Sequence, residues 1–234
     1  MKTYKFMGNL CGVILLLAFS AVAGATVLTP LPSGTTTPIL ATTETGTLVA
    51  GSTVSGSYNL GTGASGTITE SVYTEVGGTL DFVYQFTNTS QTDGIGELAV
   101  SNFAGWLTGV GYQTAAFGSF SASAGTNPNP TSASRTGVVA SPLSGTTVDF
   151  NFSPTEACNS GVGCPTPAES AILIVGTNAT TISSGFVSII DGGSQTLMGF
   201  ESPAPEPRYY GALLAIGLAM ASVVAKSRRK KQDA

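Results

Sequence analysis

The chain alternates apolar and polar residues with a period of two, the spacing of a β-strand buried on one face. Residues 80–87 show this most clearly, because large apolar side chains share one face of the expected strand and polar side chains share the other. The apolar face holds Leu80, Phe82, Tyr84 and Phe86, and the opposite face holds Asp81, Gln85 and Thr87. A helix needs a period near 3.6, so the pattern predicts an all-β fold.

Further short strands are expected in residues 68–76, 97–103, 148–152 and 186–190. Residues 171–175 form a continuous apolar run, which is typical of a central strand covered on both faces. Turn signals separate the runs, as at Gly77-Gly78 and Asp191-Gly192-Gly193. The pattern predicts an antiparallel β-sandwich, jelly-roll-like or immunoglobulin-like, in residues 45–200. The polar, Thr/Pro-rich residues 26–44 lead into it, as a mobile segment or an edge strand.

Charge is scarce and unevenly placed. Only 9% of the residues are Asp, Glu, Lys or Arg, and between residues 26 and 207 Arg135 is the one basic residue against twelve acids. We call this part of the chain the body. Because it is strongly acidic, it repels phosphate, so a nucleic-acid partner is not expected. Histidine is absent, which excludes a Ser-His-Asp arrangement and any His-ligated metal site. No catalytic, cofactor-binding or metal-binding residue is assigned.

Residues 1–25 have the composition of a secretory signal peptide. Lys2 and Lys5 precede an apolar stretch at residues 10–23, and both Ala21-Val22-Ala23 and Ala23-Gly24-Ala25 offer the small residues that suit a signal peptidase. The alternative is an uncleaved membrane anchor, but the apolar stretch is shorter than the roughly 20 residues that span a bilayer. Signal peptidase and the export translocon are therefore expected partners.

Residues 209–225 carry no charge and predict a transmembrane helix of about 25 Å. A basic tail (residues 226–234) follows and places that side in the cytoplasm, because positive residues remain inside. Its basic residues are Lys226, Arg228, Arg229, Lys230 and Lys231. The alternative is a buried helix of a soluble core. The preceding residues 201–208 are expected to be extended, because each proline disfavours helix in its predecessor.

Pro205-Glu206-Pro207, the apolar helix and the basic cluster together resemble the PEP-CTERM sorting signal of exported bacterial proteins. The resemblance implies recognition and cleavage by exosortase, a membrane enzyme, after which the mature protein is at the cell surface or extracellular. A plain proline-rich stalk before a permanent anchor is the alternative. Residues 80–112 resemble a segment of many such proteins, and we interpret them as paired strands with cross-strand aromatic contacts.

The resemblance implies a non-enzymatic surface or biofilm-matrix protein, held in the inner membrane before processing, with extracellular polysaccharide as a further partner. A carbohydrate-binding module is a second hypothesis, which predicts exposed aromatic residues around Trp106 or a polar cleft. A secreted hydrolase is a third, which requires two facing carboxylates in a pocket.

Two local features suggest chemistry. Cys158 and Cys164 enclose five residues and are expected to form a disulfide in an oxidising exterior, since a metal site would need further Cys or His ligands.

Among the acids, Asp81, Glu97 and Asp149 occupy outward-facing strand positions and are interpreted as part of a solvated face. Residues 93–97 could offer oxygen ligands to Ca²⁺ but lack the acidic density of a known loop.

Overall fold

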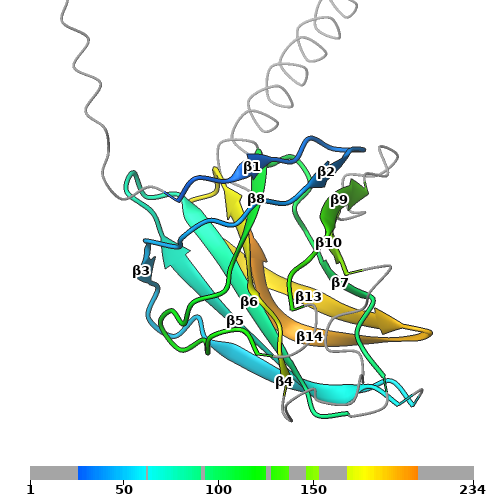
Figure 1. Ribbon diagram of the computed structural model, residues 1–234. Helices are drawn as coiled ribbons and strands as arrows, with labels where there is room; N and C mark the ends of the chain where they lie inside the picture. Colours follow the sequence, from blue (N-terminus) through cyan, green and yellow to red (C-terminus); the bar gives the residue numbers. More distant parts are fainter. Residues whose placement is uncertain are drawn as a thin grey trace, which may run out of the picture.

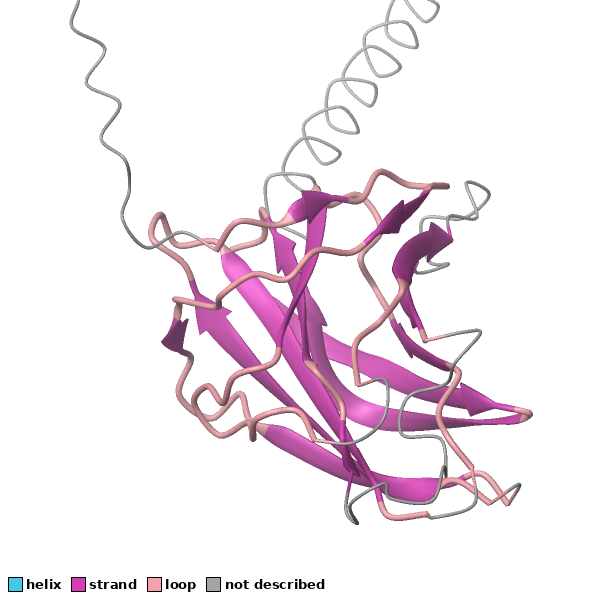
Figure 2. Cartoon of the chain, viewed as in Figure 1, coloured by secondary structure: helices cyan, strands magenta, loops and turns pink. Residues whose placement is uncertain are grey.

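The computed structural model describes residues 26–61, 63–90, 93–124, 128–136, 146–152 and 168–204. Within them the strands form two antiparallel sheets that face each other, as a β-sandwich does (Figure 1). Figure 2 shows only strands and loops in these residues. The prediction of an all-β sandwich is therefore confirmed at this level.

The eight-stranded sheet has the order β1-β8-β12-β6-β5-β3, with β11 paired to β6 and β4 paired to β5. Its strands are β1 (Thr29–Pro30), β3 (Thr47–Leu48), β4 (Val54–Asn59), β5 (Ser65–Thr74), β6 (Leu80–Asn88), β8 (Thr108–Gln113), β11 (Ala168–Glu169) and β12 (Ile172–Thr177). The strand predicted in residues 171–175 is β12, which lies between β8 and β6 and is buried along its whole length. Its central position is confirmed.

The six-stranded sheet has the order β14-β13-β7-β10-β9-β2. Its strands are β2 (Thr36–Pro38), β7 (Glu97–Val100), β9 (Ser132–Thr136), β10 (Thr147–Asn151), β13 (Ile182–Asp191) and β14 (Gly193–Pro203). The two long strands β13 and β14 form a hairpin that turns at Gly192, whose φ is 56°. The turn signal at residues 191–193 therefore marks a real turn.

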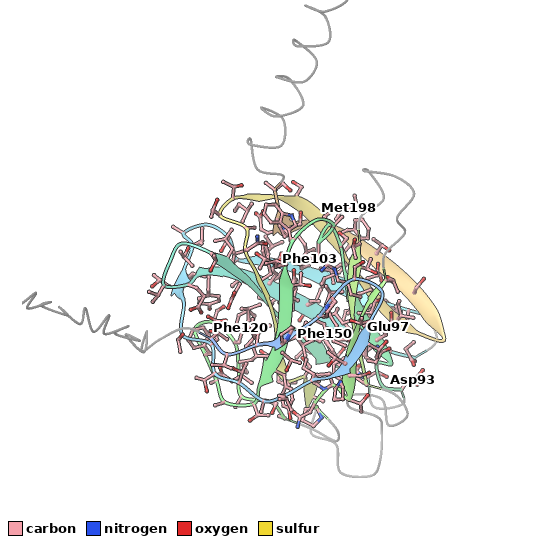
Figure 3. All side chains as sticks on the ribbon, turned by 90° about the horizontal axis from the view of Figure 1, so that it is seen from above. Asp93, Glu97, Phe103, Phe120, Phe150 and Met198 are labelled. Carbon is pink, nitrogen blue, oxygen red and sulfur yellow. The ribbon has the colours of Figure 1, made fainter. Side chains whose placement is uncertain are left out.

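The core lies between the sheets. Phe82 and Phe86 of β6 point into it, as the alternation predicts, and both are fully buried. Phe82 meets Phe103 edge to face at 5.6 Å between ring centroids, and Phe86 meets Phe152 in the same way at 5.4 Å. In Figure 3 Phe103 and Phe150 lie within the body, whereas Met198 of β14 lies at its periphery.

The interpretation of residues 80–112 as two paired strands is wrong. Strand β6 belongs to the eight-stranded sheet and pairs with β5, β11 and β12, whereas β7 belongs to the other sheet and pairs with β10 and β13. The aromatic contact between Phe82 and Phe103 therefore joins the two layers of the sandwich. Alternation determines the face of a strand but not its partner.

The N-terminal segment, residues 26–46, reaches both sheets (Figure 1). Strand β1 pairs with β8 at the end of one sheet, and β2 pairs with β9 at the end of the other. Both strands therefore have the edge position that was one of the two interpretations of the lead-in. Pro30 and Pro38 fit this position, because a proline cannot donate to a further strand.

The outer face of the eight-stranded sheet is also covered. Val83, Ile172 and Ile174 pack there with Tyr73 and Phe120 in a second apolar cluster. The side chain of Gln85 fixes the covering loop, because its Nε2 donates to Ser121 O at 2.9 Å and its Oε1 accepts from Ser121 N at 3.0 Å. The covering agrees with the prediction that residues 171–175 are buried on both faces, whereas Gln85 on the polar face of β6 is enclosed as well.

Gly199 allows a first prediction. It lies at a bulge in β14, where the register with β13 shifts, and its φ of 86° is one that L residues rarely adopt. A Cβ there would meet no atom within 4 Å, so Gly199→Ala adds backbone strain alone and should cost about 1 kcal/mol. Urea denaturation measures the loss. Gly96→Ala is the control, since its nearest contact is an ordinary 3.5 Å, and an equal loss in both variants would contradict this explanation.

Candidate functional site

Three buried carboxylates meet on the outer side of the eight-stranded sheet. Glu44, Glu75 and Asp81 each have a carboxylate oxygen within 4.8 Å of those of the other two. Glu44 is 1% exposed and Asp81 is 3% exposed, and Glu75 is also buried. We call these three residues the acidic cluster. Buried carboxylates without a counter-ion are costly, so their partners decide what the cluster can do.

The backbone explains why these three acids meet. Glu75 follows β5 and Asp81 is the second residue of β6, and the turn between them closes with a hydrogen bond from Gly78 N to Glu75 O. Glu44 comes from the N-terminal segment, where its amide donates to the side-chain oxygen of Gln113 on β8 at 2.8 Å. The cluster therefore joins the segment to the β5–β6 turn.

Thr26 bridges two of the acids. Its hydroxyl donates to Glu75 Oε1 at 2.6 Å and lies 3.3 Å from Glu44 Oε1, and its amide donates to Glu75 Oε2 at 3.3 Å. The amides of Thr45 and Gly46 donate to Glu44 Oε1 at 3.0 and 2.8 Å. Glu44 Oε2 and Asp81 Oδ2 have no hydrogen-bond partner among the described residues. Two buried oxygens of the cluster thus lack a donor.

Burial and mutual repulsion change the acidity of the cluster. Burial, and then the neighbouring carboxylates of Glu44 and Glu75, raise the pKa of Asp81 to about 8. Burial, opposed by the Gly46 amide and reinforced by Glu75, raises the pKa of Glu44 to about 7. Because charge is unfavourable here, the cluster would gain from a bound proton or a cation.

Glycines leave room around the carboxylates. A Cβ at Gly176 of β12 would lie 2.8 Å from Asp81 Oδ1, and a Cβ at Gly46 would lie 2.9 Å from Glu44 Oε1. A Cβ at Gly176 would also lie 2.1 Å from Leu28 Cδ1, and real Cβ atoms do not approach other atoms so closely, so a larger residue at either position would force these neighbours to shift. The two glycines therefore shape the space that the acids occupy.

A cavity of about 590 Å³ adjoins the cluster and is lined partly by Thr26, Glu75 and Asp81. Arg135 lines it as well, and its guanidinium donates to Thr108 Oγ1 at 2.9 Å, to Leu31 O at 3.4 Å and to Phe103 O. Within the described residues no ion pair joins Arg135 to a carboxylate. The acidic cluster therefore faces a cavity but is not neutralised by a described basic side chain.

The acids that the alternation placed on a solvated face are more buried than predicted. Asp81 belongs to the acidic cluster, and Asp149 is only 6% exposed because hydroxyl groups of neighbouring residues, including Thr136, surround it. Glu97 is half-buried, and burial together with the charge of Asp149 raises its pKa. The prediction of a solvated face is wrong for Asp81 and Asp149, because the alternation of one strand does not show what covers it.

Of the other features that the sequence analysis singled out, Trp106 lies within the described residues and most of the rest do not. Trp106 is buried at 8% exposure, so it does not form the exposed row of aromatic residues that the carbohydrate-binding hypothesis predicts. The sorting motif, Cys158 and Cys164, the signal peptide, the transmembrane helix and the basic tail all lie outside the described residues. Among the residues that are described, no helix has the length and apolar character to cross a membrane.

Sequence reasoning missed Glu44 and Glu75 as site residues. Both are isolated acids in polar surroundings, and nothing local distinguishes them from solvated side chains. The available signal was the shortage of basic residues, since a buried acid in this body has almost no cation to pair with.

No protein-family model, curated protein or solved structure matches the chain.

Proposed function

We propose that this chain is an exported, non-enzymatic surface or extracellular-matrix protein that is sorted through a PEP-CTERM-like tail. The observation that carries the proposal is the succession of Pro205-Glu206-Pro207, an uncharged stretch and a basic cluster. Exosortase would cleave near the motif while the helix of residues 209–225 holds the precursor in the inner membrane. Any of the three features alone would be weak support.

The character of the body supports the same proposal. Its residues form a β-sandwich whose strands carry many Ser and Thr side chains, and its charge is strongly acidic with Arg135 as the one basic residue. We propose a jelly-roll-like or immunoglobulin-like arrangement, flanked by a signal helix at residues 1–25 and the membrane helix. In an oxidising exterior Cys158 and Cys164 would pair in a small loop.

The other hypotheses have less support. The carbohydrate-binding module required an exposed aromatic row or a polar cleft; Trp106 is buried, and the cavity beside the cluster has a mostly apolar lining that includes Leu28, Leu31 and Leu107. The hydrolase required two facing carboxylates, and Glu75 and Asp81 both line that cavity. However, both side chains are buried, Glu75 to 8% exposure and Asp81 to 3%, which leaves little of either carboxylate open to a substrate. Glycan-array binding by the purified body would favour the module.

Replacing Pro205, Glu206 and Pro207 by alanine tests the sorting proposal. Without the motif the membrane enzyme has no recognition site, so the precursor should stay in the membrane fraction with its tail attached. Intact mass of the exported form and of the membrane-bound form measures the result. Arg208→Gln is the matched control, because this residue follows the motif without being part of it. Unchanged processing of the triple-alanine variant would refute sorting and favour a proline-rich stalk.

A further inference from the structure

We propose that Glu44, Glu75 and Asp81 form a binding site for one Ca²⁺ ion, which joins the N-terminal segment to the β5–β6 turn. The site is independent of the export proposal, because its geometry lies wholly within the described residues. It assigns a ligand to a cluster in which two buried oxygens, Glu44 Oε2 and Asp81 Oδ2, have no hydrogen-bond partner among the described residues. The site is distinct from the loop at residues 93–97.

The spacing of the carboxylates fits calcium. Calcium–oxygen bonds measure roughly 2.3–2.6 Å, so oxygens on opposite sides of one ion lie about 5 Å apart. One oxygen from each acid lies within 4.8 Å of the other two, which allows all three to reach a common ion. Glu44 Oε2 and Asp81 Oδ2, which are unpartnered and nearly fully buried, are the atoms that an ion would satisfy.

The surrounding contacts hold the ligands in place. The amides of Thr45 and Gly46 fix Glu44 Oε1 and leave its second oxygen for an ion. Thr26 orients Glu75 through both of its oxygens, as outer contacts commonly do for metal ligands. Gly46 and Gly176 leave space where a Cβ would crowd the carboxylates.

The donor set selects among metals. All three side chains offer oxygen, and with no His in the chain the site lacks the ligands that zinc and copper prefer. Magnesium requires near-octahedral oxygens at about 2.0–2.1 Å, whereas calcium accepts irregular sets of six to eight oxygens. Water from the adjoining cavity can complete such a set, since Thr26, Glu75 and Asp81 line it.

Two other species could neutralise the cluster. A proton can be shared among the acids, or signal removal after Ala25 would leave the α-ammonium group of Thr26 where its nitrogen lies 3.3 Å from Glu75 Oε2. Both would reduce the need for a metal ion. The experiment must therefore separate calcium from a proton and from an ammonium group.

The protein for the test is the body of residues 26–204, prepared with Thr26 as its first residue. Both sheets and the whole described core lie within it, so it contains what it needs to fold. At pH 7.5, 10 mM CaCl₂ should raise the Tm by about 4–7 °C, for a Kd of about 0.1–1 mM typical of extracellular sites. MgCl₂ at the same concentration should have a clearly smaller effect.

Asp81→Asn is the decisive variant. It removes one ligand charge but keeps the size of the side chain, so it should fold and should lose at least tenfold in calcium affinity by calorimetry, along with most of the Tm shift. Glu44→Gln should behave in the same way. Glu70→Gln is the matched control, because Glu70 is an equally buried acid outside the cluster and its variant should retain the full calcium shift.

Two results would overturn the proposal. The first is no calcium-induced shift in the unaltered body, and the second is an equal shift in the body and in Asp81→Asn. In the first case, a lower Tm when the α-amino group is acetylated would assign the site to the ammonium group of Thr26. Acetylation is selective here, because residues 26–204 contain no lysine.

Discussion

Replacing Phe82 by alanine is expected to lower the free energy of unfolding by about 3–5 kcal/mol, the usual cost of deleting a buried aromatic ring. Phe82 is fully buried between the two sheets and contacts Phe103 edge to face. Chemical denaturation of the body measures the loss. Met198→Ala is the control, because Met198 is 76% exposed and its truncation should change the stability by less than about 0.5 kcal/mol.

A double-mutant cycle extends this prediction to the packing of the layers. Phe82 comes from the eight-stranded sheet, and Phe103 follows β7 of the other sheet. Replacing each by leucine, alone and together, should give a coupling energy of about 0.5–1.5 kcal/mol. A coupling of zero would mean that the rings do not meet, and the face-to-face arrangement of the sheets would be wrong at this point.

The second prediction with a large expected effect is that Glu70 makes the free energy of unfolding depend on pH. This acid lies on the inner face of β5, opposite Tyr84 of β6, and its Oε2 accepts a hydrogen bond from Glu201 N of β14 at 2.6 Å. Burial raises the pKa of Glu70 to about 8, although the Glu201 amide and the Tyr84 hydroxyl act in the opposite direction. The carboxyl is therefore largely protonated in the folded protein near neutral pH.

Whether Glu70 raises or lowers the stability as pH changes follows from how many protons the folded and unfolded states bind. The unfolded carboxyl loses its proton near pH 4.5, whereas the folded one holds it to about pH 8. The folded state thus binds more protons between these values, so the stability from Glu70 is complete below pH 4.5 and is lost as pH rises through 8. Glu70→Gln should be more stable than the unaltered body at pH 9, by on the order of a few kcal/mol.

Denaturation at pH 5, 7 and 9 measures this difference. The variant should retain some decline with pH, because the pKa values of Glu44 and Asp81 are raised as well. Glu201→Gln is the control, since it removes the nearby charge but keeps the amide that bonds to Glu70. If Glu70→Gln declined between pH 5 and 9 as steeply as the unaltered body, the carboxyl of Glu70 would not be the titrating group.

Much of the fold was visible in the sequence because alternation reports burial directly. Phe82, Tyr84 and Phe86 had to share a face, and that face had to be the core, since no other arrangement buries three such rings. The run at residues 171–175 predicted a central strand for the same reason. What remained hidden was the partner of each strand, because the loops after β6 allow β7 to join either sheet.

The acidic cluster was hidden for a related reason. Asp81 lies on the polar side of β6, and a polar position predicts solvent unless another part of the chain covers it. The covering chain here includes residues 26–46 and 114–124, which have little periodicity of their own. Glu75 and Asp81 could have been placed near each other from the Gly77-Gly78 turn, but Glu44 enters only through the tertiary fold.

The position of β1 and β2 has a consequence for how the chain assembles. Synthesis proceeds from the N-terminus, so these strands are made early, yet β1 pairs with a strand about eighty residues later and β2 with one about a hundred residues later. They must wait until much of the body exists, and closing such long loops is slow. The first strands to be made are therefore among the last to find their partners.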